Sequence, residues 1–238
     1  MICHAWPAQS ICQTCRQAHI QVHARCAGCA LLLPPDSVTG AGARTPHWCA
    51  SCLRLPLDGI DGCHAAVSYG WPWQACVDGF KFGAQTGWAT ALAGVMLRDP
   101  LVRQAIRTCD VLVPMPLHPL RLAERGYNQS LLLAQALRRC TDREEKLDRH
   151  QAVVRHDWLL RIRNTQAQSR LSLAQRLRNI RQAFAVAANQ SSQLHGKRVV
   201  LVDDVMTSGA SAQAAAQTLR TAGVHQLRVV VFARTEKP

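Results

Sequence analysis

This 238-residue chain contains one especially informative stretch, Val199-Val200-Leu201-Val202-Asp203-Asp204-Val205-Met206-Thr207-Ser208-Gly209-Ala210-Ser211. Four apolar residues run into two adjacent carboxylates, and a turn of small hydroxylated residues leads into an alanine-rich segment, 210–222. An apolar run of this kind is typical of a strand that is buried on both faces of a parallel sheet. The alanine-rich segment predicts a helix, so the turn lies where a strand ends and a helix begins.

The turn 207–211 is a candidate anion site, because free backbone N–H groups and the helix dipole favour negative charge at a helix amino end. Asp203 and Asp204 stand just before it and can accept hydrogen bonds from sugar hydroxyls. A phosphate next to a diol describes a ribose 5-phosphate. The stretch resembles the signature with which type I phosphoribosyltransferases bind phosphoribosyl pyrophosphate (PRPP). The alternative is a buried strand and a tight turn whose acids cap the next helix.

Two other nucleotide-binding motifs are excluded. No Gly-Lys-Ser/Thr follows the strand, which excludes a P-loop, and Gly209 lacks the companion glycines of a dinucleotide fingerprint. If the turn takes a phosphorylated ligand, residues with separate roles are expected. Asp203 and Asp204 would hold the ribose hydroxyls or a metal-bound water. The 5-phosphate would be held by the turn residues Thr207, Ser208, Gly209, Ala210 and Ser211.

Length and patterning indicate an α/β protein, because strand-like and helix-like segments alternate along the chain. The chain is long enough for one sizeable α/β domain and a small module. No apolar run approaches the roughly 20 residues of a membrane span. The amino terminus has neither a basic start nor a long apolar stretch, so we expect no signal peptide, no transmembrane segment and a cytoplasmic location. Strands are expected near 65–69, 111–114, 184–186, 198–202 and 227–233, and helices near 74–82, 88–97, 128–139, 171–181 and 210–222.

The charge balance favours an anionic partner. The net charge is +13, with 28 Lys and Arg against 15 Asp and Glu. Most of the basic groups are guanidiniums, which match phosphate geometry well. Residues 161–181 contain six Arg and no acid. This run is either a solvated basic face or a surface for a polyanion, which would be a phosphorylated substrate or a nucleic acid.

Three Cys-x-x-Cys pairs near the amino terminus indicate structural zinc. Two such pairs supply the four thiolates of a tetrahedral site, and a region this poor in apolar residues gains its folding free energy from metal. One alternative joins the second and third pairs and leaves the first to pair with His19 or His23; the other joins the first and second pairs. The candidate ligands are Cys12, Cys15, Cys26, Cys29, Cys49 and Cys52.

The order of these motifs resembles the ComF family of competence-related, GntX-like proteins over nearly the whole chain. Besides the cysteine pairs and the 199–211 stretch, the resemblance rests on Asp78-Gly-Phe-Lys-Phe82, on the proline-rich block 111–129 and on the arginine-containing block 161–168. It implies a double zinc ribbon over residues 1–63 and a type I phosphoribosyltransferase-like parallel sheet over 64–238. Family members often carry four Cys-x-x-Cys pairs, whereas this chain has three.

The same blocks supply candidates for holding a pyrophosphate. Met115, between two prolines at a strand's end, would lie in a rigid turn that exposes backbone N–H groups. Arg121 and Arg125 are four apart and can clamp phosphate oxygens or else face solvent. Lys81 is a further candidate. Residues 161–169 resemble the hood that closes over substrate in phosphoribosyltransferases.

Three residues after Arg125 have interpretations of their own. Gly126 is expected where the chain needs a positive φ or a close approach. Tyr127 either stacks on a base or fills the core, and Asn128 can cap the following helix.

These motifs support two main hypotheses, and whether the chain is an enzyme is left open. In the first it binds PRPP or a related 5-phosphoribosyl group, with Mg²⁺ if it transfers or hydrolyses at the anomeric carbon. The family resemblance implies a role in DNA uptake and natural transformation. In the second, a non-catalytic competence protein uses the phosphoribose site and a basic surface to handle single-stranded DNA. It would then work with other competence proteins at the inner face of the membrane. A sensor of PRPP without turnover is a third possibility.

Overall fold

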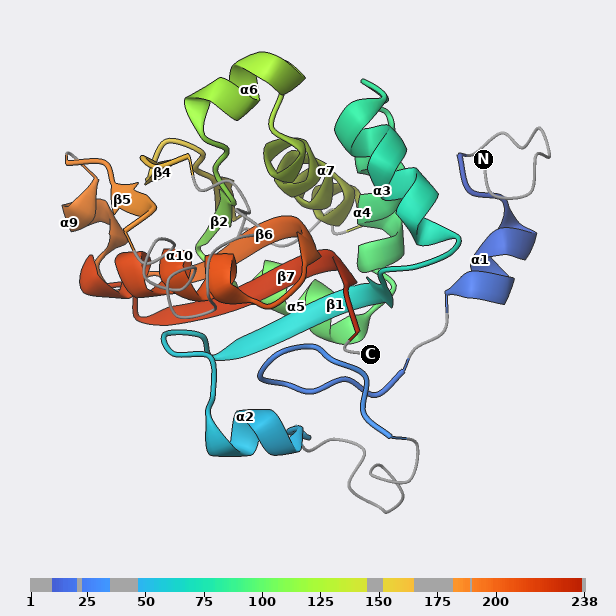
Figure 1. The fold of residues 1–238 in the computed structure, drawn as a ribbon, viewed down its shortest axis with the longest axis horizontal. Coiled ribbons are helices and arrows are strands. Elements are labelled where there is room, and N and C mark those ends of the chain that lie inside the picture. The colour runs from blue at the N-terminus through green and yellow to red at the C-terminus, as the bar shows by residue number, and fades with distance from the viewer. Residues whose placement is uncertain are drawn as a thin grey trace, which may run out of the picture.

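A five-stranded parallel sheet forms the centre of the protein (Figure 1). The computed structural model describes residues 10–20, 23–34, 47–144, 152–164, 182–188 and 190–236. The strand order is β1-β7-β6-β2-β3, and every pairing is parallel. The parallel α/β fold predicted from the sequence is confirmed. The strands are β1 (Gly62–Ser68), β2 (Val111–Pro114), β3 (Val153–Val154), β6 (Arg198–Met206) and β7 (Gln226–Arg234).

Helices cover both faces of this sheet because its central strands are apolar on both sides. On β6, Val200 and Val202 pack into one core, whereas Val199 and Leu201 pack into the other. The first core is covered by α3 (Trp73–Phe82), α4 (Trp88–Met96), α5 (Pro100–Thr108) and α7 (Gln129–Glu144). The second is covered by α10 (Ala210–Thr221), α9 (Ser191–Leu194) and the antiparallel pair β4 (Leu159–Arg161) and β5 (Phe184–Val186).

The strand β6 is longer than its apolar run. It continues through Asp203 and Asp204 to Met206, because its pairing with β7 continues to the register partners Met206 and Arg234. The two acids therefore belong to the end of a central strand.

The predicted helix at 171–181 lies outside the described residues.

The cysteine-rich segment lies on the β1 side of the sheet (Figure 1). It carries the short helices α1 (Gln13–His19) and α2 (Ala50–Arg54) and joins the sheet where the Cys63 N–H donates to the Ala27 carbonyl at 2.8 Å. Gly62 and Cys63 already lie in β1, and the division of the chain at residue 63 stays a prediction. Within the described ranges, no helix has the length and hydropathy needed to cross a membrane.

Candidate functional site

Asp203 and Asp204 are held by two helices at the end of β6. The Asp203 Oδ1 accepts hydrogen bonds from the Ser130 Oγ on α7 and from the Asp204 N–H, both at 2.9 Å. Asp204 is buried, and its Oδ2 lies 3.1 Å from the Lys81 Nζ on α3. The other oxygen of Asp204, Oδ1, accepts from the Val205 N–H at 2.7 Å. The structure thus brings the predicted acids together with the predicted Lys81.

The start of α7 fixes Ser130 in this position. The Asn128 Oδ1 accepts from the N–H groups of Ser130 at 2.9 Å and Leu131 at 3.3 Å, which is the geometry of a helix cap. The capping role predicted for Asn128 is confirmed. Gly126, two residues earlier, has a φ of 81°, which confirms the positive φ expected there. Ser130 itself was not among the predicted site residues.

The acid pair changes the titration of Asp203. Burial and, to a lesser extent, the neighbouring charge of Asp204 together raise the pKa of Asp203 to about 7. The hydrogen bonds from Ser130 and the Asp204 N–H and the charge of Lys81 act in the opposite direction. The carboxyl of Asp203 therefore changes its charge near neutral pH. In its ionised form it is a hydrogen-bond acceptor only, as ribose hydroxyls require.

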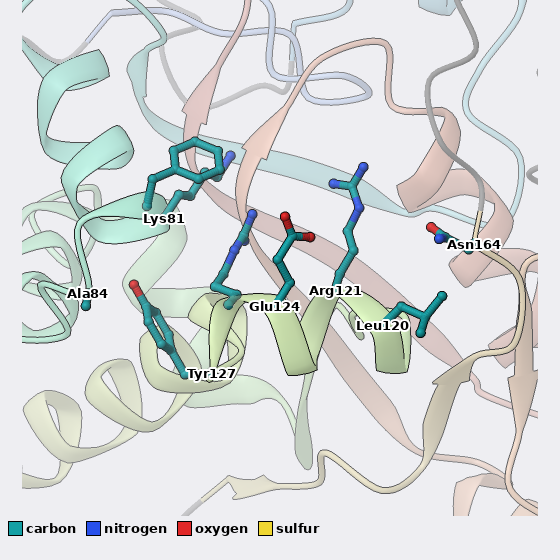
Figure 2. A pocket seen from close by; sticks show the side chains of 9 residues that line it. Lys81, Ala84, Leu120, Arg121, Glu124, Tyr127 and Asn164 are labelled. Atoms are coloured by element: carbon teal, nitrogen blue, oxygen red, sulfur yellow. The ribbon is translucent and has the colours of Figure 1, made fainter.

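A basic cleft of about 810 Å³ (Figure 2) adjoins the acid pair through Lys81, which lines the cleft and contacts Asp204. Its floor includes α6 (Pro119–Arg125), from which the side chains of Arg121 and Glu124 project toward the same side. Three cations and one carboxylate line it, so the cleft favours an anion. Its lining residues are Lys81, Phe82, Ala84, Leu120, Arg121, Glu124, Arg125, Tyr127 and Asn164.

The two predicted arginines of α6 differ in their surroundings. The Arg125 guanidinium donates to the Gln129 Oε1 at 2.6 Å and lies 5.2 Å from the centroid of the Phe82 ring. Arg121 is exposed at the cleft. Both therefore face the same space, Arg125 in a held orientation and Arg121 toward solvent.

Tyr127 belongs partly to the core. Its hydroxyl donates to the Phe80 carbonyl, and the two ring centroids are 6.4 Å apart. These contacts favour the core alternative for Tyr127, although the residue also lines the cleft.

The predicted strand-turn-helix around 207–211 is confirmed in its local structure. β6 ends at Met206, α10 begins at Ala210, and Thr207 and Ser208 between them are exposed. Gly209 has a φ of 83°, a conformation that residues with a side chain rarely adopt. The Ser208 Oγ accepts from the Ala210 N–H at 3.3 Å.

The expectation for the backbone of Met115 is wrong. The Met115 N–H donates to the Val202 carbonyl at 2.8 Å as a continuation of the β2–β6 pairing. Its carbonyl accepts from the Asn128 Nδ2 at 3.0 Å. The prolines on either side have no N–H, so the turn offers no free donor to a pyrophosphate.

Arg161 on β4, the first residue of the block predicted to be a hood, also lies near the site. Its guanidinium lies 5.6 Å from the centroid of the Phe184 ring. Burial lowers the pKa of Arg161, the positive charge of Arg121 lowers it further, and the charge of Asp203 opposes this. The charge of Arg121, which lines the cleft, and the charge of Asp203, in the acid pair, therefore both act on Arg161. The rest of the predicted hood, from residue 165, lies outside the described residues.

A second candidate centre consists of Cys26, Cys29, Cys49 and Cys52. Their sulfur atoms all lie within 4.8 Å of one another, and those of Cys29 and Cys49 are 3.7 Å apart. Four thiolates about 2.3 Å from a tetrahedral Zn²⁺ would be about 3.8 Å apart, so this cluster fits structural zinc.

The first cysteine pair stands apart from this cluster. The second and third pairs form the four-cysteine group, so the alternative that joined the first and second pairs is wrong. Cys12 and Cys15 adjoin each other at the start of α1, where the Cys15 N–H donates to the Cys12 Sγ at 3.4 Å. In the described part of the chain, no group of three or more metal-ligating side chains includes them.

The pKa shifts of the cysteine thiols in this cluster also favour a bound cation. Hydrogen bonding from the Cys29 thiol lowers the pKa of Cys26 to about 4, assisted by the Cys49 N–H at 3.2 Å. Burial raises the pKa of Cys52 to about 12, and the hydrogen bond to Cys26 raises the pKa of Cys29. The site itself stabilises one thiolate, and further ionisation needs a positive charge beside the sulfurs.

Known proteins are similar to this chain both over its carboxyl-terminal part and over nearly its whole length. Residues 146–238 match the family described as "Phosphoribosyl transferase domain". Competence protein F of Haemophilus influenzae is 29% identical over 231 residues, which cover 94% of this chain and 96% of that protein. DNA utilization protein YhgH of Salmonella typhimurium is 28% identical over 228 residues, which cover 94% and 90%.

A solved structure is also similar in part. It is a glutamine PRPP amidotransferase from B. subtilis complexed with ADP and GMP, 19% identical with a TM-score of 0.35. The match covers 60% of this chain and 25% of that chain.

Proposed function

We propose that this chain binds PRPP or a related 5-phosphoribosyl group and supports DNA uptake. Its relatives confirm the predicted resemblance to the ComF family. The observation that carries the proposal is the position of Lys81. It lines the basic cleft and also lies 3.1 Å from Asp204, so one side chain joins an anion site to an acid pair. PRPP has the matching order of groups, with a pyrophosphate beside a ribose diol.

Each part of the ligand has its own residues in this proposal. The turn 207–211 takes the 5-phosphate through its backbone N–H groups and the amino end of α10, a helix of 12 residues. Asp203 and Asp204 accept hydrogen bonds from the ribose hydroxyls. Lys81, Arg121 and Arg125 face the pyrophosphate, which matches the three cations of the cleft.

Mg²⁺ would accompany the pyrophosphate. This ion usually keeps several waters and binds through one or two carboxylates together with substrate phosphates. The Asp203 Oδ1 already accepts two hydrogen bonds and the Asp204 Oδ2 faces Lys81, so the acid pair suits contact through metal-bound water. When bound, the ion would offset pyrophosphate charge.

The chain's own residues would also shield the ligand. Arg161 and Asn164 lie on the block predicted to be a hood, and Asn164 lines the cleft. Closure there would exclude water from the anomeric carbon, which is the condition for transfer to an acceptor rather than hydrolysis. None of the described residues identifies the acceptor, so the experiment below tests binding.

Isothermal titration with two ligands tests the proposal. Zinc-loaded protein should bind ribose 5-phosphate, and PRPP with Mg²⁺ should bind more tightly. The double substitution Arg121→Gln/Arg125→Gln should weaken PRPP by about tenfold or more, because it removes charge-assisted hydrogen bonds, and should leave ribose 5-phosphate nearly unchanged.

Two further proteins complete this titration. Asp203→Asn/Asp204→Asn should weaken both ligands. Arg198→Gln is the matched control, because Arg198 pairs with Asp110 at the opposite end of β6. No binding of either ligand to the wild-type protein would reject the proposal.

A second candidate function is the handling of single-stranded DNA. The observation in its favour is Phe82, which is 75% exposed at the rim of the basic cleft. Exposed aromatics beside a positive groove are typical of single-strand binding, where bases stack and phosphates follow the cations. In this version other competence proteins at the inner face of the membrane would deliver the strand. Both versions place the chain in the cytoplasm, where thiols stay reduced.

A further inference from the structure

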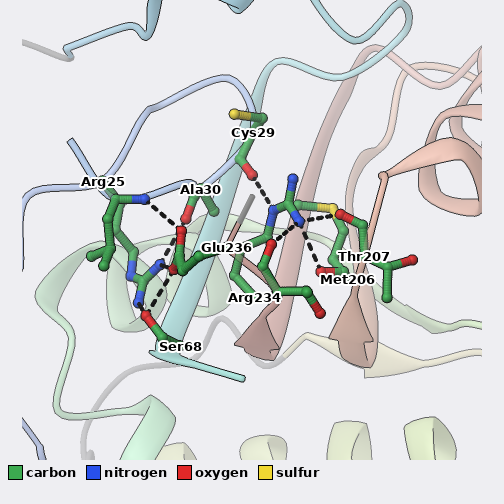
Figure 3. Close-up of polar contacts among 10 residues, drawn as sticks. Arg25, Cys29, Ala30, Ser68, Met206, Thr207, Arg234 and Glu236 are labelled. Carbon is green, nitrogen blue, oxygen red and sulfur yellow. Dashed lines mark hydrogen bonds and ion pairs between the residues drawn. The ribbon is translucent and has the colours of Figure 1, made fainter. Parts of the chain in front are cut away.

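Arg234 connects the cysteine cluster to the turn 207–211 (Figure 3). It is the last residue of β7 and is 2% exposed. Its Nε donates to the Cys29 carbonyl at 2.8 Å, within the cluster. A terminal nitrogen of the same guanidinium donates to the Met206 carbonyl at 3.0 Å and also to the Thr207 carbonyl. One rigid side chain therefore touches both centres.

Among the described residues, the hydrogen-bond partners of this guanidinium are all carbonyl oxygens. Besides those three, it donates to the Thr235 carbonyl at 2.7 Å. Across the described residues, no carboxylate lies within ion-pair distance of Arg234. A buried charge is tolerated only when it is well hydrogen-bonded, so the position of Arg234 depends on keeping these carbonyls in place. Loss of one carbonyl would shift the guanidinium and with it the other contacts.

The Cys29 carbonyl is positioned by the same loop that presents two thiolates of the cluster. The Ala30 N–H donates to the Cys26 carbonyl at 2.7 Å, and the Cys26 N–H donates to the Leu31 carbonyl at 2.8 Å. A metal ion that binds the Cys26 and Cys29 sulfurs fixes the backbone between them. Without the ion, the loop loses its cross-link to the Cys49 and Cys52 sulfurs and keeps only its hydrogen bonds.

A second contact runs parallel to the first. Leu57 packs against both the cysteine cluster and the core beneath α10. A Cβ added to Gly209 would lie 3.2 Å from the Leu57 Cδ1, so this side chain closes directly on the turn. The cysteine-rich segment therefore supports the turn at both Thr207 and Gly209.

A neighbouring group holds the chain just after Arg234. The Glu236 carboxylate accepts from the Leu32 N–H at 3.0 Å, from Arg25 at 2.9 Å and from the Ser68 Oγ at 2.7 Å (Figure 3). Arg25 in turn donates to the Ala30 carbonyl at 2.8 Å. These bonds fasten the cysteine-rich segment to the end of β7, but none of them reaches the turn.

We propose that Arg234 is a positioning residue that couples metal binding at the four-cysteine cluster to the order of the turn 207–211. Zinc and a phosphoribosyl ligand then strengthen each other's binding through this guanidinium. The part that concerns the ligand rests on the function proposed above. The part that concerns the order of the turn stands on the contacts alone.

The wild-type protein provides the first test, by hydrogen–deuterium exchange with and without a zinc chelator. Removal of zinc should speed exchange in a peptide spanning 205–213 by a factor of about 5 or more, the lower end of ordinary coupling between sites. Exchange in 198–203 should stay slow, because that part of β6 is central in the sheet. Unchanged exchange at 205–213 after zinc removal would overturn the proposal.

The second test is a thermodynamic cycle with ribose 5-phosphate and Zn²⁺. Zinc should raise the affinity for ribose 5-phosphate by about the same factor of 5 or more, and ribose 5-phosphate should raise zinc affinity equally, since coupling is reciprocal. If zinc-loaded protein binds no ribose 5-phosphate, the proposed function fails, and the exchange experiment still decides the coupling. If it binds equally well with and without zinc, the coupling fails alone.

Substitutions assign the coupling to Arg234. Arg234→Lys keeps the charge but lacks the planar fork that spans both sets of carbonyls, so both coupling factors should fall toward one. Arg25→Gln is the matched control, because it breaks bonds in the same region without touching the turn and should keep the coupling. Arg234→Gln, which also removes the charge, should abolish the coupling as well. If that variant does not fold, Arg234→Lys and the wild-type measurements decide whether Arg234 carries the coupling. Full coupling in Arg234→Lys would remove Arg234 from the proposal.

Discussion

The Lys81 Nζ lies 3.1 Å from the Asp204 Oδ2, and both side chains are largely withdrawn from water. The side chain of Asp204 is 4% exposed and that of Lys81 is 20% exposed. Removing one partner of a buried ion pair leaves an uncompensated charge, which costs about 3–5 kcal/mol in typical cases. The stability of the folded protein therefore depends on the Lys81–Asp204 ion pair, which also joins the cleft to the acid pair.

Lys81→Met should lower the free energy of unfolding by an amount near the lower end of that range, about 3 kcal/mol, because Lys81 retains some solvent. Urea unfolding at pH 8 measures it. Adding Asp204→Asn should recover part of this stability, since no charge then stays buried without a partner. A Lys81→Met protein within about 0.5 kcal/mol of wild type would show that the pair is not a stabilising contact.

Affinity for ribose 5-phosphate should rise with pH through about 7. Because burial raises the pKa of Asp203 to about 7, its carboxyl is protonated below that pH and accepts hydrogen bonds from hydroxyls less well. Titration calorimetry from pH 6 to 8.5 measures the midpoint. Asp203→Asn should abolish this transition while leaving that of the ligand phosphate near pH 6.

Ser130→Ala sharpens the same test. The hydrogen bond from Ser130 lowers the pKa of Asp203, so its removal should move the midpoint to higher pH. Protein stability should change in the opposite sense to affinity. A raised carboxyl pKa favours the folded state while the group is protonated, so this contribution is lost as pH rises from about 4 to about 7. A midpoint that stays fixed in Ser130→Ala would contradict the assignment to Asp203.

Gly209→Ala should lower the free energy of unfolding by about 1–2 kcal/mol and weaken ribose 5-phosphate. The φ of 83° is unfavourable for alanine, and the new Cβ would lie 3.2 Å from the Leu57 Cδ1. Gly126→Ala is the matched control, because Gly126 has a φ of 81° and no atom within 4 Å of an added Cβ. It should show the backbone cost with unchanged affinity. Gly209→Val should abolish binding, and equal affinity in all three variants would place the ligand elsewhere.

The sequence predicted the centre of the sheet well because the signals there are local. The apolar run before Asp203 identified β6, and the Cys-x-x-Cys spacing gave six candidate zinc ligands, four of which the structure brings together. The end of β6 was underestimated, since its last residues pair with β7 and the pairing depends on a distant strand. A local sequence pattern therefore predicts the start of a buried strand better than its end, because the end depends on pairing with a distant strand.

Contacts between distant segments were beyond the sequence. Ser130 reaches Asp203 from 73 residues away, and Arg234 reaches the Cys29 carbonyl from 205 residues away. The only local signals were a serine in the first turn after a capping asparagine and an arginine at the end of an apolar strand. The prediction for Met115 was wrong for a different reason. The proline-rich turn was recognised from local sequence, but the Met115 N–H is already bonded within the sheet.

Cys49→Ser should lose the zinc of the four-cysteine cluster, measured by metal analysis of the purified protein. Three thiolates bind less tightly than four, and the apolar content around the cluster is small. Cys12→Ser/Cys15→Ser should keep that zinc, because the first pair lies outside the cluster. The sheet should stay folded in both proteins by circular dichroism. A metal-free wild-type preparation with an intact cysteine-rich segment would reject structural zinc.

The block around Arg161 distinguishes the hood from a DNA-binding surface. Arg161 lies over Phe184 and shares the field of Arg121 and Asp203, which favours closure over a phosphorylated ligand. In that case Arg161→Gln/Arg163→Gln should raise the dissociation constant for PRPP several-fold and leave oligonucleotide binding unchanged. If the block binds DNA instead, the slope of log K against log salt for single strands should flatten by about 0.7 for each phosphate that an arginine no longer neutralises, or about 1.4 for the double substitution. Binding would then weaken alike for every sequence, because interactions with phosphate carry no base information. Arg198→Gln again provides a control, since it removes one positive charge at the far end of β6. Unchanged binding of both ligands would mean that Arg161 and Arg163 are part of a solvated basic face.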